Sequence, residues 1–162
     1  MDIGFNLYPL AGVQDETLSW LVRLYAFHGA TDAPRVDIRR DGRYGWPIFR
    51  DLGYGEWSSA RYVLPRSQTI NVTPAGDGGT VVASYEADLR GLGGNTAVVF
   101  ASGFLNPDGN QGGMPFGLFA ALSDGSVVEL PAASGGKSDL NIAMSQNITL
   151  VRNSGDGAGR HR

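Results

Sequence analysis

The chain has 162 residues, a formal net charge of −3 at pH 7 and no cysteine. This length suits one ordinary domain, and the missing cysteines exclude both a disulfide framework and a thiolate metal site. The small negative charge gives no electrostatic reason to expect nucleic acid as a partner. No run approaches the roughly 20 apolar residues of a membrane span, so we expect no membrane insertion. Residues 1–12 lack a basic start and a small-residue cleavage site, so we expect no signal peptide in this chain.

Strands are expected from the first third of the chain onward. Residues 20–27 are apolar on both faces, which predicts a central strand, and a corner rich in small residues then leads to a second strand at Val36 and Ile38. Strict alternation of apolar and polar residues over 67–73 and 80–90 predicts two half-buried antiparallel strands.

Two further segments, 96–102 and 116–122, are again apolar on both faces and are expected to be central strands. Residues rich in Gly, Asn and Asp separate the strands at the intervals that tight turns need. The whole pattern predicts an all-β fold, an immunoglobulin-like Greek-key β-sandwich of about 7–9 strands over residues 14–131. The expected core consists of Val22, Leu24, Val36, Ile38, Ile70, Val72, Val81, Ala83, Tyr85, Val98, Phe100, Leu118, Val128 and Leu130.

Both ends of the chain are expected to form extra strands outside this domain. Residues 1–13 form an N-terminal extension that is a candidate for an exchanged or closing strand, residues 132–139 form a Gly/Ser linker, and residues 140–162 form a C-terminal strand with a frayed tail. Strand exchange between subunits would use such ends, and an excised piece of a tandem array would have the same composition. The candidate self-association residues are Ile3, Phe5, Leu7, Ile142, Met144, Ile148 and Leu150.

Catalytic chemistry has little support in the sequence. A serine or threonine nucleophile needs a histidine base, and the chain contains only His28 and His161. A triad built on His28 would have to use Asp32 or Asp37 as its carboxylate, whereas a corner histidine bonded to a backbone carbonyl is the simpler interpretation. We therefore expect no catalytic residues and no enzyme activity.

A metal site has one weak candidate. Asn106, Asp108 and Asn110 occupy alternate positions in a Gly-rich loop, as in the first half of a calcium loop. The glycine falls one place late, however, and no glutamate follows to close the site, so we favour a turn stabilised by Asn and Asp side chains. We expect no cofactor, and Ca²⁺ is the alternative.

Arginine and aromatic residues interleave over residues 35–66. Aromatic faces stack on sugar rings, and guanidinium groups bind carboxylate or sulfate through paired hydrogen bonds, so an acidic polysaccharide is a sensible ligand. The competing interpretation places the tryptophans in the core and the arginines on solvated strand faces. The candidate ligand-binding residues are Arg39, Arg43, Tyr44, Trp46, Tyr54 and Trp57.

Several blocks of the sequence resemble a known bacterial family. The segments VRLYAFHGATDAPRVDI (22–38), INVTPAG (70–76), VVASYEADLRGL (81–92) and AVVFASGFLNP (97–107) follow the order seen in the domain of unknown function 4397 family, and the similarity extends to residue 131. The stretch His28-Gly29-Ala30-Thr31 departs from the Ser-Pro that many members have there. The resemblance implies an extracellular or cell-surface β-sandwich module, often repeated in tandem, with no assigned catalytic residues.

Together these observations predict a non-catalytic extracellular or cell-surface structural or adhesive module. Its expected partner is a further copy of itself, in a fibre or filament, or a neighbouring tandem repeat, bound through the terminal strands. The alternative is a carbohydrate-binding module that recognises an acidic polysaccharide through residues 35–66.

Overall fold

Strands form where apolar and polar residues alternate and where both faces are apolar. The computed structural model describes residues 6–42, 45–77 and 80–134, and within them it contains nine strands and one short 3₁₀ helix, η1. Their bounds are β1 (Val22–His28), β2 (Val36–Arg40), β3 (Pro47–Leu52), β4 (Arg61–Val63), β5 (Ser67–Pro74), β6 (Ala83–Asp88), β7 (Thr96–Ser102), η1 (Asp108–Asn110), β8 (Gly117–Leu122) and β9 (Val127–Glu129).

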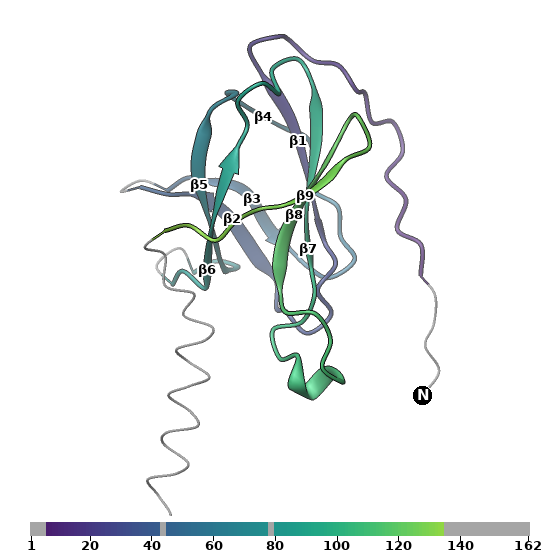
Figure 1. Cartoon of the computed structure of the whole chain (residues 1–162), viewed down its shortest axis with the longest axis vertical. Coiled ribbons are helices and arrows are strands. Elements are labelled where there is room, and N and C mark those ends of the chain that lie inside the picture. Colours follow the sequence, from purple (N-terminus) through teal and green to yellow (C-terminus); the bar gives the residue numbers. More distant parts are fainter. Residues whose placement is uncertain (1–5, 43–44, 78–79, 135–162) are drawn as a thin grey trace, which may run out of the picture.

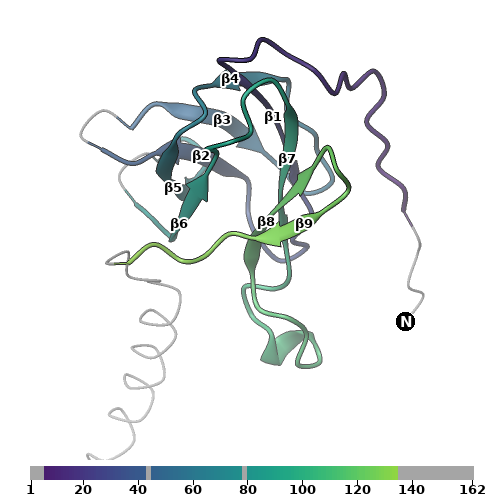
Figure 2. The same cartoon turned by 45° about the horizontal axis from the view of Figure 1, so that its top comes forward.

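The strands form two sheets that pack as a β-sandwich (Figures 1 and 2). One sheet has the order β4-β1-β7-β8-β9 and the other has the order β3-β2-β5-β6. β1 and β7 are parallel, and the other paired strands are antiparallel. The all-β sandwich expected from the sequence is confirmed, whereas its immunoglobulin-like Greek-key connectivity stays a prediction.

The core lies between the sheets and contains most of the residues expected there. Ten of the fourteen expected positions are buried, among them Val22, Ile38 and Leu118. The expectation was wrong at Val81, Val98 and Phe100, which are half-buried, and it was also wrong at Val128, which is 48% exposed on the edge strand β9.

The register of β7 explains two of these errors. Its inward positions are Ala97, Val99 and Ala101, which are all buried. Phe100 lies on the outer face, where its ring stacks on that of Phe119 with 5.5 Å between the centroids. A strand that is apolar on both faces does not reveal which face is inward from its pattern alone.

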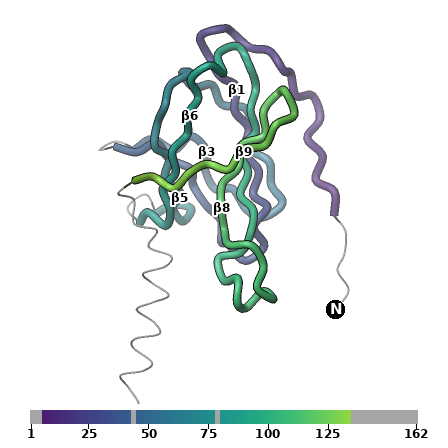
Figure 3. Tube along the Cα trace, viewed as in Figure 1, coloured from purple at the N-terminus to yellow at the C-terminus, as the bar shows by residue number. Residues whose placement is uncertain are grey.

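The chain after β9 crosses from one sheet to the other, as the tube in Figure 3 shows. There the backbone N–H of Glu86 donates to Pro131 O, and that of Ala133 donates to Ser84 O, both at 2.9 Å. Residues 131–133 therefore cover the free edge of β6, and the folded part of the chain extends past the boundary expected at residue 131. No helix in residues 6–42, 45–77 and 80–134 has the length and apolar character of a membrane span.

Candidate functional site

The outer face of the four-stranded sheet carries polar side chains on its two central strands. Val36 and Ile38 of β2 point into the core, so the residue between them, Asp37, points outward together with Arg39. The same alternation on β5 turns Asn71 and Thr73 outward, because Ile70 and Val72 face the core.

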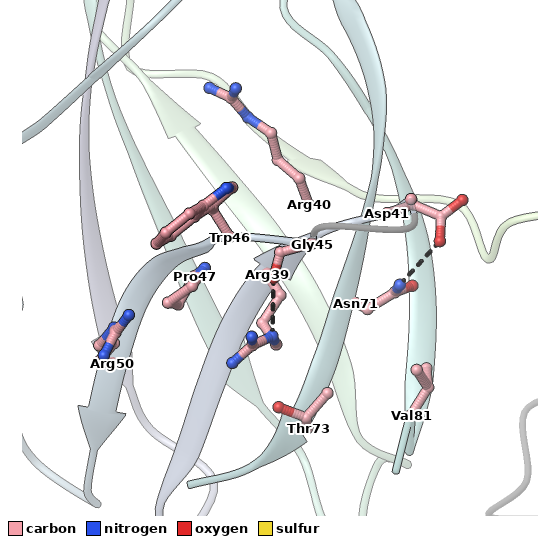
Figure 4. Close-up of a pocket in the computed structure, with 11 residues that line it drawn as sticks. Arg39, Arg40, Asp41, Gly45, Trp46, Pro47, Arg50, Asn71, Thr73 and Val81 are labelled. Carbon is pink, nitrogen blue, oxygen red and sulfur yellow. Dashed lines mark hydrogen bonds between the residues drawn. The ribbon is translucent and has the colours of Figure 1, made fainter. Parts of the chain in front are cut away.

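A groove with a volume of about 450 Å³ runs over this polar face (Figure 4). We call it the basic groove, because its charged lining residues are three arginines, Arg39, Arg40 and Arg50, and one acid, Asp41. The remaining lining residues are Gly42, Gly45, Trp46, Pro47, Asn71, Thr73 and Val81.

Arg39 is held in place beneath the groove by a buried carboxylate. Asp37 is only 4% exposed, and its carboxylate accepts hydrogen bonds from the backbone N–H of Asp51 at 2.8 Å and from Arg39 Nη1 at 3.3 Å. Arg39 Nε also donates to Gly45 O at 3.0 Å. These bonds fix the guanidinium before any ligand arrives, which reduces the entropy that binding has to overcome.

Arg40 and Arg50 have no acidic partner among the residues that the structure describes. Neither guanidinium makes a hydrogen bond or ion pair with any of these described residues. Arg40 Nε is buried and has no hydrogen-bond partner among them. Arg35 outside the groove differs, because it pairs with Asp51 and Glu56, and its hydrogen bonds lower the pKa of Glu56. The groove therefore contains two arginines whose charge no described acid neutralises.

Trp46 gives the basic groove a large apolar surface. It directly precedes β3 and is 73% exposed, and it lies between Arg40 and Pro47 in Figure 4. An exposed tryptophan beside free guanidinium groups combines a stacking surface with donors for an anion. The alternative that placed Trp46 in the sandwich core was wrong.

The floor of the groove contributes one more polar atom. Thr73 is fully buried, and its Oγ1 has no hydrogen-bond partner among the described residues. Buried hydroxyls are usually bonded, so Thr73 Oγ1 is an exception in the layer beneath the groove.

The structure does not bring the predicted ligand-binding residues together at one site. Arg39 and Trp46 both line the groove, whereas Arg43 and Tyr44 lie outside the described residues. Tyr54 and Trp57 belong to a distant aromatic cluster, in which the ring of Trp57 packs on Phe27 at 4.7 Å and the ring of Tyr54 packs on Tyr8 at 6.0 Å. The indole N–H of Trp57 donates to Tyr8 O at 2.9 Å, so this cluster fastens the N-terminal segment to the sandwich.

Sequence reasoning missed the part of the groove that β5 provides. Asn71 and Thr73 lie on an alternating strand, where outward polar residues are ordinary. The signal that could have found them is the pairing of β5 with β2, which brings Arg39 opposite Asn71. Local patterns do not show which strands are neighbours.

The candidate calcium loop is tied together by its own hydrogen bonds. The carboxylate of Asp32 accepts from the backbone N–H of Leu105 and of Asn106, both at 2.9 Å, and from Asn110 Nδ2 at 3.2 Å. Asn106 Oδ1 accepts from Gly109 N–H at 3.1 Å. Asn110 thus directs an amide nitrogen, not an oxygen, toward the acid, and Asp108 has no side-chain hydrogen bond to the described residues. The calcium site stays a prediction, and this geometry fits the alternative of a stabilised turn.

His28 lies in the interior and is 1% exposed. Its Nε2 is 3.0 Å from Pro34 O, as expected for a corner histidine. Asp32 and Asp37, its two candidate triad partners, bond to the loop at 105–110 and to Arg39.

Of the candidate self-association residues, Leu7 is 76% exposed. The others, which are Ile3, Phe5, Ile142, Met144, Ile148 and Leu150, lie outside the described residues.

Comparisons with known proteins give no relative for this chain. No family model, curated protein or solved structure matches it. The resemblance to the domain of unknown function 4397 family stays a prediction, and the functional argument depends on the groove itself.

Proposed function

We propose that this protein is a non-catalytic module that binds an acidic polysaccharide in the basic groove, outside the cell or on its surface. The observation that carries the proposal is that the side chains of Arg40 and Arg50, which have no partner among the described residues, line the same groove as the exposed indole of Trp46.

The chemistry of each part suits a sugar acid. Guanidinium groups donate paired, charge-assisted hydrogen bonds to a carboxylate or sulfate, and such bonds are about twice as strong as neutral ones. The indole of Trp46 offers a face on which the apolar side of a sugar ring can stack. The protein as a whole carries a charge of −3, so attraction of an anion to this groove is local and needs the groove arginines.

Affinity electrophoresis through gels that contain polygalacturonate, dextran sulfate or neutral dextran tests the proposal. We expect the acidic polymers to retard the protein and neutral dextran to leave its mobility unchanged. Arg50→Ala and Trp46→Ala should each weaken binding about tenfold, which corresponds to about 1.4 kcal/mol.

Two matched variants control for the general loss of charge or aromatic surface. Arg66→Ala removes an exposed arginine without a described partner, and Trp20→Ala removes a tryptophan that is 59% exposed; neither residue lines the groove. Both should migrate like the unmodified protein. Equal retardation of all four variants would rule out the groove as the binding site.

Self-association is a second candidate function, and it has support of its own. β9 is an edge strand, and its Val127 and Val128 are 57% and 48% exposed. An edge with free backbone groups and apolar side chains can add a strand from another copy of the chain.

A further inference from the structure

The basic groove continues into a second pocket on the same sheet. This pocket, which we call the polar pocket, has a volume of about 300 Å³ and lies over β5 and β6. Asp41 and Asn71 line both cavities, so the two are contiguous. Together they extend from β3 to β6 across four neighbouring strands, a width of about 14 Å at the usual strand spacing.

Asn71 forms a rigid bridge between the two cavities. Its Nδ2 donates to Asp41 Oδ1 at 3.1 Å, and its Oδ1 accepts from Ser84 Oγ at 2.7 Å. Both ends of the amide are therefore used, which fixes Asp41 on one side and Ser84 on the other. A ligand that crosses the bridge meets a preformed surface.

The two cavities differ in charge. Three arginines line the basic groove, whereas the charged residues that line the polar pocket are both acids, Asp41 and Glu86. Thr69 Oγ1 donates to Glu86 Oε1 at 3.0 Å, which orients this carboxylate and leaves its other oxygen available. Carboxylates accept hydrogen bonds from sugar hydroxyls and repel a second sugar acid.

We propose that the two cavities bind one oligosaccharide in which a sugar acid is joined to a neutral sugar. This inference rests on the proposed function and specifies its ligand. The sugar acid lies in the basic groove, which the arginines and Trp46 line, and the hydroxyls of the neutral sugar lie against Glu86 and Ser84. A polymer made only of sugar acids is disfavoured, because it would bring a carboxylate to the acids of the polar pocket.

Isothermal titration calorimetry of the full chain with three tetrasaccharides tests this specificity. The probes are a hyaluronan tetrasaccharide, in which glucuronate alternates with N-acetylglucosamine, tetragalacturonate, and neutral cellotetraose. We expect the alternating probe to bind about tenfold more tightly than tetragalacturonate. Attraction by the arginines alone predicts the reverse order, since tetragalacturonate carries more negative charge.

Two variants connect this preference to the polar pocket. Glu86→Gln removes the negative charge that repels a second sugar acid, so it should tighten tetragalacturonate binding about fivefold. The difference in affinity between the two acidic probes should then become smaller. Ser84→Ala should weaken binding of the alternating probe about threefold and leave tetragalacturonate unchanged. Glu129→Gln is the matched control, because Glu129 is an exposed acid on β9 that lines neither cavity, and it should change nothing.

The outcomes separate this inference from the proposed function. Suppose that tetragalacturonate binds as tightly as the alternating probe, that Glu86→Gln has no effect, and that Arg50→Ala weakens the binding of both. The polar pocket then takes no sugar, and only the present inference is overturned. If neither acidic tetrasaccharide binds the unmodified protein, the proposed function fails together with it.

Discussion

At the scale of single residues, Asp32 shows how one side chain connects distant parts of the chain. It lies in the corner between β1 and β2, and its carboxylate accepts two backbone N–H groups and one side-chain amide from the loop at 105–110. The sequence suggested two chemical roles for this region, a catalytic carboxylate in the corner and a calcium site in the loop. The structure shows that Asp32 caps the loop.

We predict that Asp32→Ala lowers the free energy of unfolding by about 1 kcal/mol, a modest value because the carboxylate is exposed to solvent. The cost should appear locally, as faster hydrogen exchange at the amides of Leu105 and Asn106, which lose their acceptor. Asp108→Ala is the control, since this acid lies in the same loop without a described side-chain bond. Equal exchange rates in the two variants would mean that Asp32 does not hold the loop.

The structure separates the candidate ligand-binding residues of the segment 35–66 for a physical reason. Arg39 and Trp46 were predicted as ligand-binding residues because they occur in one short arginine-rich and aromatic segment, and both line the groove. Trp57 belongs to the same segment but packs on Phe27 of β1, in a different sheet from the groove. Proximity in sequence cannot separate these two tryptophans, because the chain between them leaves β3 and passes to the other sheet.

At the scale of strands, alternation predicted the inward face where one face is polar and failed where both are apolar. β5 and β6 place Ile70, Val72, Ala83 and Tyr85 in the core, as expected. β7 has apolar residues on both faces, and only its pairing with β1 and β8 selects Val99 as an inward residue.

A pair of variants in β7 tests this register. We predict that Val99→Ala costs about 2 kcal/mol in the free energy of unfolding, because it leaves a cavity between the sheets. Val98→Ala should cost about 0.5 kcal/mol, because Val98 is half-buried on the outer face and its site can be filled by solvent. Urea denaturation followed by tryptophan fluorescence measures both. A larger loss for Val98→Ala would reverse the assigned faces.

At the scale of the whole molecule, the sandwich could be predicted but the arrangement of its strands could not. Composition, turn spacing and alternation indicate two packed sheets, because each strand must bury one face. The parallel pairing of β1 with β7 joins segments about 70 residues apart, and the cover on β6 comes from residues 131–133. Neither feature has a local sequence signal. Because residues 131–133 leave the sheet of β9 to cover β6, β9 remains the edge strand of its own sheet.

That edge determines the last prediction, which concerns the association of whole chains. If copies join through β9, sedimentation velocity of the full chain should show oligomers that grow with concentration. Val128→Lys should return the protein to a monomer, because a charged side chain on an edge strand opposes strand addition. Met114→Lys places the same charge on a residue that is 74% exposed in the loop between β7 and β8, and it should leave the oligomers intact. A monomer at every concentration would rule out self-association and leave ligand binding in the basic groove as the remaining proposal.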